Sequence, residues 1–166
     1  MSPLSRPMRV TMMPLVAIAL LAASSPTARA QATKLKWGPA PAVFPHGATM
    51  AVVSGDPTKA GPFVAQLRMP SGYRIAPHWH PTDEHILVKE GTFLLGMGDK
   101  MDANTMKSMT VLKAGQSGDA KANVHHFAAT QGHTVVEVSA QGPFVLNYVN
   151  PADNPQKPKA KAKTKA

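Results

Sequence analysis

The sequence predicts an all-β domain, and three observations support that fold class. Short segments rich in Val, Leu, Phe and Thr alternate with Gly, Pro, Asn and Asp from about residue 34 to residue 150, a pattern typical of strands joined by turns. Only residues 102–109 suit a short helix. The length of this region supports one domain with one hydrophobic core. A sandwich or a closed barrel is therefore expected.

The expected elements follow this alternation along the chain. Nine segments are predicted to be strands: Thr49–Val53, Phe63–Met69, Arg74–His80, Glu84–Lys89, Thr92–Met97, Thr110–Lys113, Val124–Ala129, Thr134–Ser139 and Phe144–Val149. Gly and Pro mark turns between several of them, among others at residues 90–91 and 131–132. Asp102 is a candidate N-cap for the short helix. Residues 116–121 are too polar for a core strand, so they are expected to form an edge or a loop.

The first thirty residues are predicted to be a cleaved export signal. Arg6 and Arg9 precede an apolar run over residues 10–23, and Ala-Arg-Ala at 28–30 fits an A-x-A cleavage site. An uncleaved membrane anchor is the alternative, but the run is shorter than the roughly 20 residues of a spanning helix. We therefore expect a periplasmic or secreted protein whose domain covers residues 31–150.

The charge of the chain is concentrated at its ends. Three of the eighteen basic residues lie in the predicted signal and five lie at the C-terminus, which leaves ten basic against nine acidic residues. A domain so close to neutral does not have the basic patch of a specific nucleic-acid-binding protein. The Pro-, Ala- and Lys-rich residues 151–166 are expected to be a disordered tail. They would either contact anionic surfaces or remain solvated without a partner.

The densest chemical signal is HWHPTDEH, residues 78–85, which holds three of the seven histidines. Residues two apart on a strand share a face, so His78 and His80 point the same way. Glu84 has the same parity, and its carboxylate can return to that side after a turn. Two imidazoles and a carboxylate supply three ligands of a first-row transition metal. The neighbours expected to face elsewhere are Trp79, Asp83 and His85.

His125 and His126 supply a candidate fourth ligand. They are adjacent in one predicted strand, and the alternation of side chains lets only one of them face the interior. The alternation does not say which. The other histidines, His46 and His133, are expected in a loop and an exposed turn, with a lid role left open for His46. The chain has no cysteine, which excludes thiolate chemistry and Cys-ligated zinc.

The spacing around the first cluster resembles that of the cupins, small β-barrels of jelly-roll type. Gly72, five residues, His78-x-His80, three residues, Glu84, six residues and Gly91 match the first cupin motif without a gap. The resemblance covers roughly residues 49–149. It implies a single jelly-roll β-barrel.

The second cupin motif, Pro-x-Gly-x-x-His, is matched less well by residues 121–126. Asn123 stands at the glycine position, which is a mild change because Asn tolerates a left-handed turn. Lys121 replaces the proline, and Thr130 stands where an asparagine is usual. This alignment places His126 at the ligand position, and a slip of one residue would promote His125 instead.

The resemblance implies a metal held by His78, His80, Glu84 and His126. Three nitrogens and one oxygen suit Mn, Fe, Ni, Cu or Zn rather than calcium. The first functional hypothesis is a metal-dependent enzyme acting on a small organic molecule, with oxygenation ahead of isomerisation or lyase chemistry. The alternative is a non-catalytic binding or sensing module, in which the metal anchors a ligand or ties strands together.

Two further expectations concern the pocket and the assembly. Few polar residues beyond the ligands are available to line a pocket, and the candidates are Gln66, Tyr73, Arg74 and Tyr148. No general base can be named from the sequence. A homodimer is predicted, because small barrels commonly pair through edge strands whose backbone groups lack partners.

Overall fold

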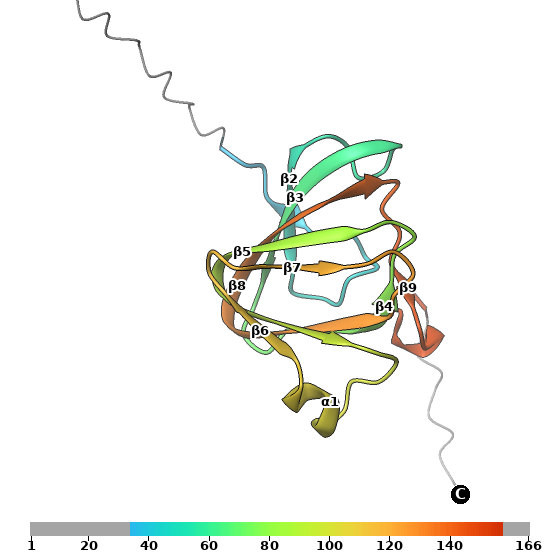
Figure 1. Ribbon diagram of the computed structural model, residues 1–166. Coiled ribbons are helices and arrows are strands. Elements are labelled where there is room, and N and C mark those ends of the chain that lie inside the picture. The colour runs from blue at the N-terminus through green and yellow to red at the C-terminus, as the bar shows by residue number, and fades with distance from the viewer. Residues whose placement is uncertain (1–33, 158–166) are drawn as a thin grey trace, which may run out of the picture. The chain divides into compact units, whose positions relative to one another are not determined.

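The computed structural model describes residues 34–157, so the predicted export signal and most of the Lys-rich tail lie outside the described residues. Figure 1 shows an antiparallel sheet that curls around an interior, with one short helix at its lower end. Within the described part of the chain, no helix is long and apolar enough to cross a membrane. The predicted all-β class is confirmed.

Nine strands form one sheet, and each pairing is antiparallel. The elements are β1 Gly38–Pro39, β2 Thr49–Ser54, β3 Gly61–Met69, β4 Arg74–Trp79, β5 Glu84–Met97, α1 Ala103–Lys107, β6 Thr110–Lys113, β7 Ser117–Ala120, β8 His126–Gly142, β9 Asn147–Tyr148 and the 3₁₀ helix η1 Pro151–Asp153. The order β1-β2-β3-β8-β4-β9 makes one path, and β5 joins β8 to β6 and β7.

The two longest strands, β5 and β8, correct the prediction. Each was expected as two strands separated by a glycine turn, at residues 90–91 and 131–132. Gly91 and Gly132 do adopt positive φ angles of 77° and 76°, but the pairing of β5 with β8 continues on both sides with register shifts. The glycines therefore bend the strands as β-bulges do, rather than reversing the chain.

The bends let each long strand change its partner. Residues 134–142 of β8 pair with β3, while residues 126–129 pair with β4. Residues 84–87 of β5 pair with β7, and residues 92–95 pair with β6. As a result the sheet curls on itself, and the beginnings of β5 and β8 reach the same interior as the end of β4 (Figure 1).

The polar segment 116–121 and the predicted last strand had different outcomes. Ser117–Ala120 forms β7, which pairs only with β5 among the described residues and is therefore the edge that was expected. The segment Phe144–Val149 forms only the two-residue strand β9. The Phe144 N–H donates to Pro57 O at 2.7 Å, and Val145 O accepts a hydrogen bond from the His80 ring. These backbone groups are thus unavailable to a strand pairing.

The short helix is confirmed, with Asp102 as its cap. The Asp102 carboxylate accepts the N–H groups of Asn104 and Thr105, and the Thr105 hydroxyl accepts the Asp102 N–H, which makes a capping box. A small apolar cluster lies beside the helix, apart from the main core. It contains Leu94, Met109, Phe127 and Ala129, with Met101 and Met106 packed against them.

The main core lines the inside of the curled sheet. Alternate residues of β3 are buried, namely Phe63, Ala65, Leu67 and Met69. Residues Pro151–Asp153, at the start of the predicted tail, form η1, which is capped by the Asn150 side chain. The Asn150 side chain accepts the Ala152 N–H, a local hydrogen bond that the composition of the tail does not predict.

Candidate metal centre

Three histidines converge inside the curled sheet from two neighbouring strands. His78 is in β4, His80 follows its last residue, and His126 opens β8, where it is paired with His78 in register. The candidate ligand nitrogens of the three rings lie within 4.8 Å of one another. All three side chains are buried, with exposed fractions of 3%, 2% and 2%. The predicted side-chain parity therefore places the first two rings together.

Backbone carbonyls orient each ring. The Nδ1 atoms of His78, His80 and His126 lie 2.8, 2.7 and 3.0 Å from the carbonyl oxygens of Ala76, Val145 and Val124. A carbonyl oxygen only accepts, so each Nδ1 carries the hydrogen and donates it. The lone pair of each neutral ring is then on Nε2, as a metal ligand requires.

Two of these Nε2 atoms have no hydrogen-bond partner. The Nε2 atoms of His80 and His126 are buried and unpaired, although leaving a buried polar group unpaired costs about 1–3 kcal/mol. A cation placed between the rings would satisfy both lone pairs. The residues present thus fit a divalent metal, on the evidence of their own unpaired atoms.

Glu84 brings a negative charge to the same point. Its Oε2 lies 3.5 Å from Nε2 of His80 and 3.5 Å from Nε2 of His126. Burial alone would raise the pKa of Glu84, but the two imidazoles whose Nε2 atoms lie close to its Oε2 lower that pKa below its usual range. The carboxylate is therefore ionised, as metal binding requires.

The imidazole of His78 is held in its neutral form. Burial, followed by the neighbouring His126 and His80 rings, lowers its pKa to about 3. A proton therefore does not compete for this ring near neutral pH. His78 and Glu84 thus have the protonation states that metal ligands require.

The segment before His126 is fastened to the segment that bears His80. The Asn123 N–H donates to His80 O at 2.8 Å, and Asp83 accepts both the Ala122 N–H at 2.8 Å and the Lys121 ammonium at 3.0 Å. Asn123 has a φ of 61°, so it adopts the left-handed turn expected at the glycine position. Lys121, which replaces the proline of the second cupin motif, forms this ion pair with Asp83.

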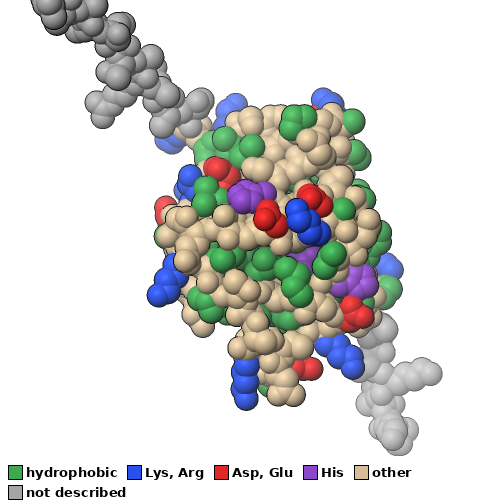
Figure 2. Space-filling view, viewed as in Figure 1, with side chains coloured by type: hydrophobic (Ala, Val, Ile, Leu, Met, Phe, Trp, Pro, Cys, Tyr) green, Lys and Arg blue, Asp and Glu red, His purple; other side chains and the backbone are tan. Residues whose placement is uncertain are grey.

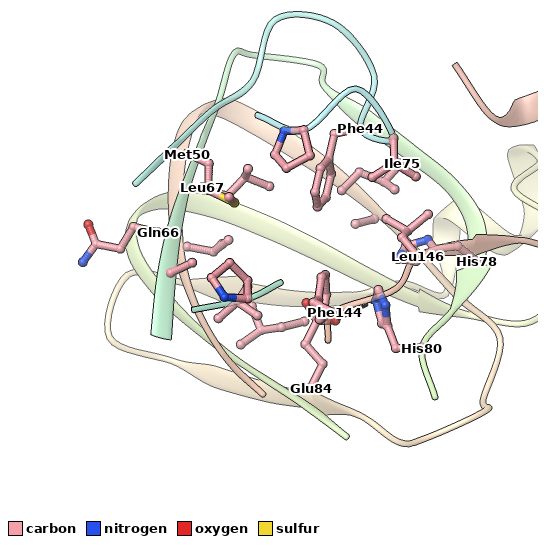
Figure 3. Close-up of a pocket in the computed structure, with 18 of the residues that line it drawn as sticks. Phe44, Met50, Gln66, Leu67, Ile75, His78, His80, Glu84, Phe144 and Leu146 are labelled. Atoms are coloured by element: carbon pink, nitrogen blue, oxygen red, sulfur yellow. Dashed lines mark ion pairs between the residues drawn. The ribbon is translucent and has the colours of Figure 1, made fainter. Parts of the chain in front are cut away.

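A cavity of about 400 Å³ adjoins the four candidate ligands, all of which line it. Its remaining wall is almost entirely apolar, as the side chains in Figure 3 show. Phe44 reaches into it from the β1–β2 loop, which we define as residues 40–48, and Phe144 stacks on the His80 ring with centroids 4.4 Å apart. Sequence analysis missed both aromatic residues, because no periodic pattern marks a side chain that enters from a loop.

The other histidines lie away from the centre. His125 is partly exposed and pairs with Asp99 at 2.6 Å, and the exposed His85 pairs with Asp119 at 2.8 Å. His46 and His133 are exposed. The structure thus brings His126, and not His125, to the other two rings.

The four predicted polar pocket residues do not present free polar groups to the cavity. Gln66 donates to Glu137 at 2.8 Å, and Figure 3 shows its side chain directed away from the cavity. The hydroxyls of Tyr73 and Tyr148 donate to Pro45 O at 2.5 Å and Val43 O at 2.8 Å. Arg74 is exposed. These residues support the walls and the β1–β2 loop instead.

The outer surface has no concentrated charge on the face drawn in Figure 2. Basic side chains lie scattered among acidic and apolar ones there, rather than in one patch. The near balance of acidic and basic residues in the domain is thus visible on that face.

Comparisons with known proteins identify the fold. No family model and no curated protein sequence matches the chain. Among solved structures, the polyketide cyclase RemF from Streptomyces resistomycificus has a TM-score of 0.53 at 17% identity, covering 68% of this chain and 80% of its own.

Two other solved structures are similar at lower scores. A protein with a double-stranded β-helix domain from Klebsiella pneumoniae has a TM-score of 0.48 at 22% identity, covering 64% of this chain and 90% of its own. A cupin superfamily protein from Desulfitobacterium hafniense has a TM-score of 0.47 at 10% identity, covering 58% and 78%. The likeness to RemF shows that this chain, with its curled antiparallel sheet, shares that protein's fold.

Proposed function

We propose that this protein is an exported, metal-dependent enzyme that acts on a small organic molecule. The observation that carries the proposal is the pair of buried, unpaired Nε2 atoms of His80 and His126 beside an ionised Glu84. With His78 they make a set of three nitrogens and one oxygen. Such a set suits Mn, Fe, Ni, Cu or Zn.

The metal, when bound, supplies a Lewis acid that polarises an oxygen-bearing group or lowers the pKa of bound water. The chain's own residues do the rest. Backbone carbonyls keep each Nε2 directed inward. The apolar wall excludes bulk water and orients the organic molecule. Such chemistry requires a metal site that leaves a coordination position open to the organic molecule. The adjoining cavity favours an open site of this kind over a closed structural one.

The lining of the cavity narrows the class of reaction. Within residues 34–157, no acid or base lines the cavity other than the four candidate ligands. A reaction that needs a separate protein side chain as general base has no candidate among them. We therefore place oxygenation ahead of isomerisation and lyase chemistry.

A second candidate function rests on the same scarcity of polar groups. A non-catalytic binding or sensing module needs only a metal anchor and an apolar wall, and both are available here. Native mass spectrometry distinguishes the two functions, because a binding module returns its ligand unchanged whereas an enzyme converts it.

Elemental analysis of the protein, purified without chelator, tests the metal centre. We expect near-stoichiometric transition metal in the original protein and in His125→Ala, and its loss in His126→Ala and His78→Ala. The adjacent histidines form a matched pair, because His125 directly precedes β8, His126 is its first residue, and only His126 faces the other rings. Equal metal in the two variants would contradict the site.

Turnover then tests the enzyme. The metal-loaded protein is assayed against enolic, phenolic and hydroxy-acid substrates, under air and under nitrogen. Conversion that depends on air supports oxygenation, and conversion under both gases supports isomerase or lyase chemistry. A panel without turnover, combined with unchanged captured ligand, favours the binding module.

A further inference from the structure

The titratable groups that line the cavity gather at one end of it. Figure 3 shows His78, His80 and Glu84 at one side, with Phe44, Met50 and Leu67 on the opposite wall. The ligand therefore meets the candidate metal centre with one end only. The rest of it faces hydrocarbon.

The walls hold no free charge for a second polar group. No Lys or Arg among residues 34–157 lines the cavity. Of the other polar lining residues, Gln66 donates to Glu137, and the Thr58 hydroxyl donates to Asp56 at 2.7 Å. A carboxylate, phosphate or hydroxyl on the body of a ligand would lose its hydration without gaining a partner, which is unfavourable.

The apolar wall is also rich in aromatic rings. Four of the five phenylalanines of the chain line the cavity, namely Phe44, Phe63, Phe93 and Phe144. The Phe144 ring lies against Phe63 in an edge-to-face contact with centroids 5.4 Å apart, and it stacks on His80. Aromatic pairs favour such contacts. A flat ring near the candidate metal centre would find the same kind of partners.

We infer that the ligand is an aromatic or other largely apolar small molecule with a single oxygen-bearing head group, and that sugars, dicarboxylates and phosphates are excluded. This inference rests on the proposed function, since it assigns the head group to the metal and the body to the apolar wall. The cavity of about 400 Å³ lies within the range of small-molecule sites, roughly 300–1,000 Å³.

Calorimetric titration of the cobalt-loaded protein tests the inference. The probes are 3-phenylpropionate and succinate, which share a carboxylate head and differ in bearing a phenyl ring or a second carboxylate. We expect 3-phenylpropionate to bind at least about tenfold more tightly, because its ring is buried against apolar surface. Equal affinity, or tighter binding of succinate, would overturn the inference.

Two variants of the cavity wall test whether the preference for 3-phenylpropionate over succinate arises there. Phe44→Ala removes part of the wall, and Val138→Thr places a hydroxyl in it at nearly constant volume. Both variants are expected to weaken the binding of 3-phenylpropionate more than that of succinate. The control is Val111→Ala, at an exposed position outside the cavity, which is expected to change neither affinity. Unchanged selectivity in both cavity variants, with cobalt content retained, would place the probe elsewhere and overturn the inference.

Azide separates failure of this inference from failure of the proposed function. A change in the cobalt spectrum on adding azide shows an open metal site, whatever the organic probes do. An azide response without selectivity for 3-phenylpropionate overturns the ligand class and leaves the metal-dependent function standing. Absence of bound cobalt overturns both.

Discussion

At the scale of single residues, Asp83 joins the two segments that carry the candidate ligands. Its two carboxylate oxygens accept the Ala122 N–H and the Lys121 ammonium, and the same hydrogen bonds lower its pKa. The residue precedes Glu84 directly in the chain, yet it faces solvent. Asp83 is thus a positioning residue for the turn that leads to His126.

We predict that Asp83→Ala weakens metal binding on the order of tenfold, a loss typical when residues around a metal-ligand shell are removed. Asp83→Asn keeps an oxygen for the Ala122 N–H and is expected to retain most of the affinity. Competition with a chromophoric chelator measures both. The matched control is Asp119→Ala, another exposed aspartate whose partner is His85. If Asp83→Ala bound metal as tightly as the original protein, the turn would keep its conformation without the Asp83 hydrogen bonds, and the prediction would be wrong.

The sequence predicted part of the centre and left part open, for identifiable reasons. The parity of residues 78, 80 and 84 was sufficient to group three side chains. Strand alternation could not choose between His125 and His126, and the choice depended on a resemblance to cupin spacing. The structure adds the reason why the rings are oriented, since the carbonyls of Ala76, Val124 and Val145 accept their Nδ1 hydrogens. Two of those carbonyls lie two residues before their own histidine, but Val145 is remote in sequence.

At the scale of elements, the β1–β2 loop is held over the cavity by the only two tyrosines of the chain. Their hydroxyls donate to backbone oxygens at Val43 and Pro45, on either side of Phe44. Burial raises the pKa of Tyr148 to about 12, and it raises the pKa of Tyr73 above its ordinary range. Both phenols are thus favoured in their neutral, donating form.

This arrangement predicts a loss of stability at alkaline pH. In the unfolded chain a tyrosine ionises near pH 10. The free energy of unfolding is therefore insensitive to these groups below about pH 10, and it falls as the pH rises above that value through the folded-state pKa. Urea unfolding at a series of alkaline pH values measures the fall, and ultraviolet absorbance of phenolate reports the two tyrosines alone. Tyr73→Phe is expected to lose less stability across this window, and an identical pH profile would refute the role of that phenol.

Elements that depend on local chemistry were predicted better than those that depend on distant partners. The helix cap at Asp102 is a local signal, and it was confirmed. A glycine with positive φ suits both a turn and a bulge, so Gly91 and Gly132 could not reveal that β5 and β8 continue. Strand β9 is shorter than predicted because residues 57 and 80, far away in the sequence, use the backbone of Phe144 and Val145.

At the scale of the whole molecule, the domain has no disulfide bond to stabilise it. It contains no cysteine, so its stability rests on the apolar core and on whatever binds the folded state. The candidate centre draws its residues from β4, β5 and β8 and from the chain after β4, which are the elements whose pairing curls the sheet. A metal at that point connects segments that are separate in sequence. Its binding is therefore expected to stabilise the whole fold rather than one loop.

This linkage has a predicted size. A metal that binds only the folded protein, present at a hundred times its Kd, adds about 2.7 kcal/mol to the free energy of unfolding. For a domain of this length the corresponding rise in Tm is roughly 10 °C. Calorimetric scans with added metal and with chelator measure it, and His126→Ala is the control expected to show no rise. A similar rise in that variant would assign the stabilisation to exposed pairs such as His85–Asp119, and would remove the buried centre as its cause.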